Sequence, residues 1–188
     1  SPRVAWAVVA VIFAHQIATL LHITIGPLPT VDRDPIDFHN FANGTGGEHL
    51  ENSRYAHLLR TLYQVFGASH LLGCEVSQLT FALALIVFSE MIECLELGAY
   101  RARLILFFGL PPSMVLNTSV VMRESAQILF FLLFCLSLLK LRRGESSSWM
   151  AVTIAAITCL IFLHKAYAIL LFFTVLPFLG ALWNRKAL

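Results

Sequence analysis

Charged residues are scarce in this chain. Of its 188 residues only 13% are Asp, Glu, Lys or Arg, whereas 58% are hydrophobic. A water-soluble domain has about 25% charged and about 45–50% apolar residues. This deficit excludes an ordinary soluble domain and predicts a polytopic membrane protein. The net charge of +2 gives no indication of a nucleic-acid partner, and the sequence contains no nucleic-acid-binding module.

Several catalytic and metal-binding motifs are also missing. The sequence has no Gly-rich phosphate loop, no GxSxG, no HExxH and no CxxC. Its four cysteines (Cys74, Cys94, Cys135 and Cys159) are scattered along the chain. Because a free cysteine behaves as a small apolar residue, we expect them to pack in the interior.

Long apolar runs dominate what is present. They predict an all-α fold with about six transmembrane helices in one domain, residues 1–188. The six runs cover residues 4–25, 76–97, 104–121, 125–139, 149–163 and 166–183. The third run is interrupted by Pro111-Pro112. Such a break at membrane depth needs neighbours or water to satisfy the freed backbone groups, so it predicts a cavity.

One long polar segment, residues 26–52, separates the first two apolar runs. It holds three Pro, four Gly and an acidic cluster, which is typical of a long loop. Residues 53–66 follow with apolar side chains at helical spacing and Arg54, His57 and Arg60 on the other face. They predict an interfacial amphipathic helix within an outward region, residues 27–71.

The distribution of Lys and Arg predicts the orientation. With six crossings, eight basic residues fall on one side: Arg3, Arg101, Arg103, Lys140, Arg142, Arg143, Arg185 and Lys186. The other side has five basic residues spread over more sequence. The positive-inside rule therefore predicts cytoplasmic termini in an inner or plasma membrane. By contrast, Glu90, Glu93 and Glu96 share one helix face beside Arg101, which favours a charge-compensated helix end over a proton relay.

The remaining unusual charges then face outward together. They are Asp32, Asp34, Asp37 and His39 in the polar segment, and Arg123, Glu124, His164 and Lys165 further on. Carboxylates beside a histidine can hold a divalent cation or include a general base. Cations beside carboxylates suit an anionic group such as a phosphate, bound directly or through a metal. The alternative is a solvated surface loop with ordinary turn chemistry.

A family resemblance rests on a short set of motifs. Leu110-Pro111-Pro112-Ser113, Thr118-Ser119 and Arg123-Glu124 precede a Leu/Phe-rich run, and His164-Lys165-Ala166-Tyr167 follows later. This layout resembles the polytopic membrane glycosyltransferases of the C-type superfamily and related bacterial polysaccharide polymerases. Those enzymes have nine or more crossings, so this chain resembles a front portion or a reduced relative.

The resemblance implies a set of roles. A polyprenyl-phosphate lipid would carry the sugar at the outer membrane face. Asp34 and Asp37 would act as catalytic carboxylates, and Asp32 and Asp34 would hold Mg²⁺ or Mn²⁺. His39, Arg123, Glu124, His164 and Lys165 would bind the substrate.

Two other functions fit the sequence. Fifteen Phe residues in a short chain suit a structural accessory subunit of a larger membrane complex. His15 and His22 share one helix face, so they are candidate haem or pigment ligands, with a His22–His70 or His22–His164 pair as one possibility. A polar stripe facing neighbouring helices is the favoured interpretation of both residues.

Overall fold

The computed structural model describes residues 1–26 and 34–169, and every regular element there is helical. The helices are α1 (Pro2–Ile25), α2 (Asp34–Asn43), α3 (Arg54–Phe66), α4 (His70–Cys94), α5 (Arg101–Gly109), α6 (Pro112–Thr118), α7 (Glu124–Arg142) and α8 (Ser148–Leu163), with 3-10 turns η1 (Glu48–Leu50) and η2 (Gly98–Tyr100). The prediction of an all-α fold is confirmed for this part of the chain.

Three of these helices are long and apolar enough to cross a membrane, namely α1, α4 and α7. Helix α8 is apolar but has only 16 residues. The predicted third crossing is divided into α5 and α6, of 9 and 7 residues, and neither reaches the length of about 20 that a crossing needs. Most of the predicted sixth crossing, residues 166–183, lies outside the described residues. The structure therefore supports a membrane protein but does not confirm six crossings.

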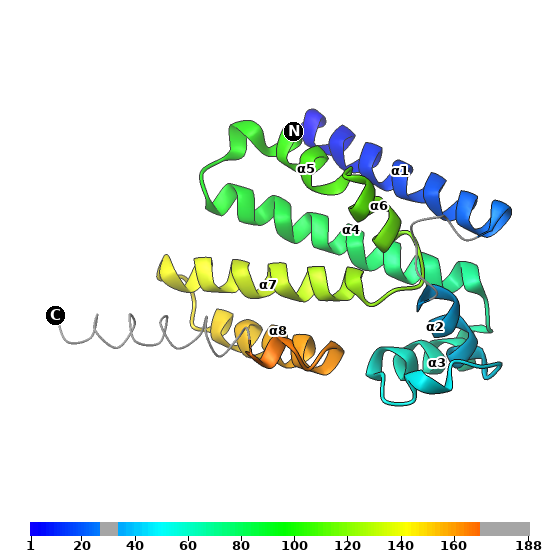
Figure 1. The fold of residues 1–188 in the computed structure, drawn as a ribbon. Helices are drawn as coiled ribbons and strands as arrows, with labels where there is room; N and C mark the ends of the chain where they lie inside the picture. The colour runs from blue at the N-terminus through cyan, green and yellow to red at the C-terminus, as the bar shows by residue number, and fades with distance from the viewer. Residues whose placement is uncertain (27–33, 170–188) are drawn as a thin grey trace.

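Helix α4 lies in the middle of the bundle (Figure 1). It packs against α1 on one side and α7 on the other, and α8 packs on the far side of α7. The short helices α5 and α6 lie beside α1, while α2 and α3 pack together at one end. The main apolar core between α1, α4, α5 and α7 includes Val11, Phe81, Leu85, Ile105 and Leu132.

The amphipathic helix forms as the sequence predicts. Helix α3 begins after Ser53, whose hydroxyl oxygen accepts a hydrogen bond from the Ala56 amide at 3.4 Å, as an N-cap does. Its apolar face buries Tyr55, Leu59 and Tyr63 in a cluster shared with α2. That α3 also lies on a membrane surface stays a prediction.

Part of the polar segment is helical, contrary to the prediction of a loop over residues 26–52. Helix α2 starts at Asp34, and Pro35 lies in its first turn, where a missing amide hydrogen costs nothing. Phe38, Phe41 and Ala42 follow at helical spacing and are buried against α3. The Asp-Pro pair that indicates a turn by sequence is here a helix start.

Side chains from α1 satisfy the backbone where the Pro pair separates α5 from α6. The His15 Nε2 donates to the Gly109 carbonyl at 2.9 Å, and the Thr118 hydroxyl donates to His15 Nδ1 at 2.7 Å. The Thr19 hydroxyl donates to the Ser119 carbonyl at 2.6 Å. These bonds supply the compensation that a helix break at membrane depth requires. They also use both nitrogens of His15, which fits the favoured polar stripe.

We expect His15→Phe to lower the free energy of unfolding by about 2 kcal/mol, because it leaves the buried Gly109 carbonyl and Thr118 hydroxyl with fewer partners. Phe preserves the ring stacked on Phe81, whose centroid is 4.6 Å away. Titration with SDS of the protein in mild detergent measures this change. His57→Phe is the control, since His57 is exposed and its ring contacts the Glu51 carbonyl and, edge to face, the Phe41 ring, an aromatic contact that Phe can keep. Equal stability of His15→Phe and the wild type would contradict the role assigned to His15.

The end of the bundle that holds the chain start is rich in paired charges. Glu90 pairs with Lys140, Glu93 with Arg101 and Glu96 with Arg143. The interpretation of a charge-compensated helix end is confirmed. Arg3 lies near Gly98 and Ala102 beside the same end. Of the basic residues assigned to one side of the membrane, Arg3, Arg101, Lys140 and Arg143 therefore lie at one end of the bundle, while Arg185 and Lys186 lie outside the described residues.

Candidate functional site

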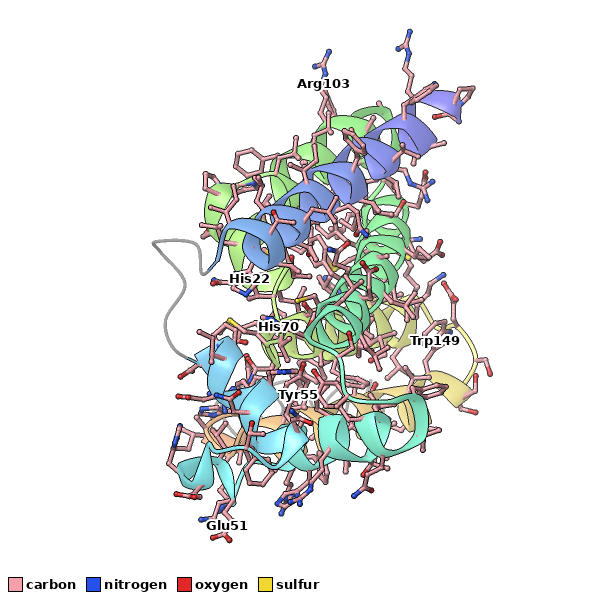
Figure 2. The ribbon with its side chains drawn as sticks, turned by 90° about the vertical axis from the view of Figure 1, so that its right-hand side faces the viewer. His22, Glu51, Tyr55, His70, Arg103 and Trp149 are labelled. Atoms are coloured by element: carbon pink, nitrogen blue, oxygen red, sulfur yellow. The ribbon has the colours of Figure 1, made fainter. Side chains whose placement is uncertain are left out.

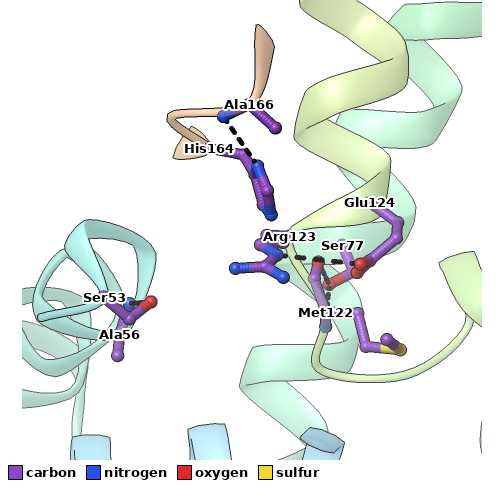
Figure 3. Close-up of polar contacts among 8 residues, drawn as sticks. All are labelled: Ser53, Ala56, Ser77, Met122, Arg123, Glu124, His164 and Ala166. Carbon is purple, nitrogen blue, oxygen red and sulfur yellow. Dashed lines mark hydrogen bonds and ion pairs between the residues drawn. The ribbon is translucent and has the colours of Figure 1, made fainter. Parts of the chain in front are cut away.

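The opposite end of α7 holds the residues that the sequence singled out. Arg123 and Glu124 start α7, and His164 directly follows α8. Together with Gln127 and Tyr167, these three residues line a pocket of about 320 Å³. Figure 3 shows His164 pointing toward Arg123. The fold thus brings His164 close to Arg123 and Glu124, which lie about forty residues earlier in the sequence.

The start of α7 is fixed against α4. The Ser77 hydroxyl donates to the Met122 carbonyl at 3.3 Å, and the Met122 amide approaches the same hydroxyl oxygen at 3.4 Å (Figure 3). Because Met122 directly precedes Arg123, this contact sets where the following two charged side chains leave the backbone. The site therefore depends on α4 as well as on α7 and α8.

A second pocket, of about 240 Å³, is lined by basic side chains from three elements. Arg54 comes from the start of α3, Arg123 from the start of α7, and His164 and Lys165 from the end of α8. The guanidinium of Arg54 also stacks on Phe162, 4.9 Å from the ring centre. Among the described residues, the only acidic ion-pair partner of these cations is Glu124, 3.8 Å from Arg123. The excess of positive charge suits an anion such as a phosphate.

An apolar groove of about 410 Å³ opens beside the α5–α6 break. Phe108, Met114, Ile128, Phe131 and Leu132 form its apolar wall. Its polar end is formed by Glu124, Gln127 and Tyr167, which also line the first pocket. The cavity predicted from Pro111-Pro112 is therefore present, and it continues into the charged pocket.

Several polar atoms of this region are buried and have no hydrogen-bond partner among the described residues. They are Arg123 Nε, Glu124 Oε2, Ser125 Oγ and Tyr55 Oη. An unpaired buried polar atom costs about 1–3 kcal/mol, so such atoms usually meet water or a ligand. Burial raises the pKa of Tyr55 to about 12, which keeps its phenol protonated and able to donate at neutral pH.

The predicted carboxylates separate into two groups. Asp34 is exposed at the start of α2 and lies near enough to Glu124 to act on it electrostatically. Asp37 instead faces His49, with 3.5 Å between Oδ2 and Nε2. Asp32 lies outside the described residues. Asp34 is therefore the loop carboxylate that the structure brings toward Arg123 and Glu124.

His39 does not join the charged pockets. Its Nδ1 lies 2.9 Å from the Tyr63 hydroxyl, and its ring packs on His70 with the centroids 4.9 Å apart. His39 is absent from the linings of the three pockets described above. Conversely, the sequence analysis assigned no site role to Arg54 or Tyr55, because they lie on the two faces of an amphipathic helix. Only the packing of α3 brings Arg54 to the pocket and buries the Tyr55 hydroxyl without a partner among the described residues.

The predicted metal and pigment sites can be compared with the described part of the chain. Within residues 1–26 and 34–169, no three His, Cys, Asp or Glu side chains already surround one point where a metal ion would sit. The predicted Mg²⁺ or Mn²⁺ site at Asp32 and Asp34 stays a prediction, because Asp32 is not among those residues. His22 and His70 meet edge to face, with centroids 5.2 Å apart, which leaves no room for a porphyrin between them.

Comparison with known proteins identifies no relative. The chain matches no protein family, no curated protein and no solved structure. Function must therefore be inferred from the chemistry of the site: a groove with apolar walls, a polar junction at Glu124, and an adjoining pocket lined by Arg54, Arg123 and Lys165.

Proposed function

We propose that this chain is a glycosyltransferase-like membrane protein that uses a lipid-linked phosphate sugar donor. The observation that carries the proposal is that three pockets adjoin through shared lining residues. The apolar groove shares Glu124, Gln127 and Tyr167 with the pocket at Arg123, and that pocket shares Arg123 and His164 with the one lined by Arg54 and Lys165. An amphiphile suits this arrangement, because its hydrocarbon chain can lie in the apolar groove while its phosphate lies among the basic side chains. The Arg guanidinium groups suit the phosphate, because they bind its oxygens in pairs.

The carboxylates supply the chemistry of this proposal. Glu124 or Asp34 accepts the proton of the acceptor hydroxyl while that oxygen bonds to the sugar anomeric carbon. The bond between this carbon and the phosphate oxygen breaks, and the polyprenyl phosphate leaves. Arg54, Arg123 and Lys165 stabilise its negative charge, since preorganised cations near a leaving group lower the barrier. Asp37 has no part in this step because it faces His49.

We further propose that the pockets face outward and that the paired-charge end faces the cytoplasm. Arg101, Lys140 and Arg143 gather at that end, as the positive-inside rule favours. With this orientation the chain start faces the cytoplasm and Arg123 faces outward. That the chain end is also cytoplasmic, in an inner or plasma membrane, is the prediction made from the distribution of Lys and Arg.

A second candidate function is a non-catalytic accessory subunit. It is favoured by the exposed apolar side chains of α1 and α5, including Trp6 (72% exposed), Phe13 (65%) and Phe107 (80%), which suit either lipid or neighbouring membrane helices. Native mass measurement after gentle extraction separates the two. A large particle of several chains favours the subunit, whereas a particle of this chain alone favours the enzyme.

Binding of a radiolabelled polyprenyl phosphate to the purified protein tests the proposed site. We expect saturable binding, and we expect the triple variant Arg54→Gln/Arg123→Gln/Lys165→Gln to bind at least about 1,000-fold more weakly, since each hydrogen bond to a charged group contributes about 1.5–3 kcal/mol. The matched control is Arg103→Gln/Arg142→Gln, which removes exposed cations elsewhere on the chain and should bind like the wild type. Equal binding of the uncharged polyprenol, or unchanged binding by the triple variant, would contradict the proposal.

A further inference from the structure

Three histidines from three helices meet outside the charged pockets. His22 lies near the end of α1, His39 in α2, and His70 begins α4. The His70 ring is the central one, with its centroid 5.2 Å from that of His22 and 4.9 Å from that of His39. Figure 2 shows His22 and His70 next to each other. The proposed transfer reaction uses none of these rings.

The hydrogen bonding of this cluster is incomplete. His22 is only 3% exposed, and neither of its ring nitrogens has a partner among the described residues. The Nε2 of His70 is likewise buried and unpartnered. A neutral imidazole offers one donor and one acceptor, and leaving them unpaired in the interior is costly. Two of the three neighbouring rings thus carry three buried nitrogens with no partner in residues 1–26 and 34–169, so the cluster has room for a shared ligand.

We propose that His22, His39 and His70 bind a divalent transition-metal ion, with Zn²⁺ as the representative ion. Imidazole nitrogens are preferred ligands of Zn²⁺. Two imidazoles on one tetrahedral Zn²⁺, at Zn–N distances of about 2.0–2.1 Å, have ring centres about 5 Å apart. Both observed separations, 5.2 and 4.9 Å, agree with this spacing.

The surroundings of His39 fit the role of a ligand. Its Nδ1 is engaged with the Tyr63 hydroxyl, which leaves Nε2 for the ion. A metal-binding histidine usually has its second nitrogen held in this way by an outer hydrogen-bond partner.

In the described residues no group of three His, Cys, Asp or Glu side chains is placed to hold a metal ion, so binding requires these histidines to rearrange. A half-turn of an imidazole exchanges nitrogen and carbon positions with almost no change of shape. No hydrogen bond fixes the ring of His22 against such a turn. The ion itself would therefore set the ring orientations.

Titration with Co²⁺ tests this site in the full chain, purified in detergent, stripped with a chelator and freed of any histidine tag. We expect one Co²⁺ per chain, with the intense visible absorption of tetrahedral cobalt, and displacement by Zn²⁺. His22→Ala and His70→Ala should each weaken binding at least tenfold, and Tyr63→Phe about tenfold. His49→Ala and His57→Ala are matched controls, because both residues are exposed and lie outside the cluster.

Two results would overturn the proposal: only the weak absorption of hydrated Co²⁺, or unchanged binding by the double variant His22→Ala/His70→Ala. X-ray absorption of the Zn²⁺-loaded wild type gives a test that needs no variant. A spectrum that shows three imidazole ligands on the ion would support the proposed site, and fewer than three would contradict it. Because no step involves a lipid phosphate, the outcome is independent of the proposed transferase function.

Discussion

Glu124→Gln is expected to reduce glycosyl transfer about 100-fold or more, since a positioned general base contributes about 10²–10⁴ to the rate. Glu124 borders both the apolar groove and the polar pocket, and its Oε2 has no partner among the described residues. Gln preserves the shape but cannot accept the proton. The measurement is release of polyprenyl phosphate from a polyprenyl-phosphate sugar, with kcat falling more than KM rises.

The two loop aspartates provide the comparison for this prediction. Asp34→Asn should also lower turnover, because Asp34 lies near Glu124. Asp37→Asn should remain within about twofold of the wild type, as a partly exposed residue away from the reacting groups usually does, because its contact is His49. Full activity of Glu124→Gln combined with loss of activity in Asp37→Asn would reverse the assignment of the carboxylates.

Gly109→Ala is expected to lower the free energy of unfolding by about 3 kcal/mol, toward the upper end of the usual range for overpacking. A Cβ at this position would lie 2.5 and 2.8 Å from the two methyl carbons of Val11. Val11 is fully buried, so it has little freedom to move aside. SDS titration or thermal unfolding in detergent measures the loss.

Val11→Ala provides the matched test of this clash. Alone it should destabilise, because it leaves a cavity. Combined with Gly109→Ala it should cost at least about 1 kcal/mol less than the sum of the two single changes, as neighbouring residues in contact do. Strict additivity would show that the close packing of α1 on α5 is not what Gly109 provides.

The structure brings together the charged residues that the sequence analysis singled out after apolar runs, and their role in a site stays a prediction. Arg123, Glu124, His164 and Lys165 were singled out because charge at membrane depth is costly and therefore informative. Arg54 was not, because an arginine on the polar face of an amphipathic helix is ordinary. Its place in the cationic pocket depends on where the start of α3 meets the end of α8.

The sequence analysis names a His22–His70 pair as one possibility, but the roles of Tyr55 and of His39 beside His70 could not be predicted, for a related reason. By its position on the apolar face of α3, Tyr55 is expected to be a core residue. The structure agrees, since Tyr55 is 5% exposed. That its hydroxyl lies unpartnered beside other unpartnered polar atoms is a property of the packing. His22, His39 and His70 are separated by 17 and 31 residues in the sequence, with no metal-binding spacing to connect them.

The sequence by itself determined the class of protein and the helices with strong patterns. Scarce charge and long apolar runs require a membrane environment, because such surfaces cannot be stably exposed to water. The apolar spacing of residues 53–66 and the N-cap Ser53 determined α3. Composition, apolar spacing and an N-cap are local properties, so each can be predicted from one segment of the sequence alone.

Only the tertiary structure decided how the third apolar run and the polar segment fold. Residues 104–121 are apolar enough for a crossing, yet Pro111-Pro112 divides them, and the break is held by His15 and Thr19 from α1. Residues 34–43 are polar in composition, yet Phe38 and Phe41 are buried because they pack against the apolar face of α3. In both cases the free energy depends on a neighbouring helix, which the local sequence does not contain.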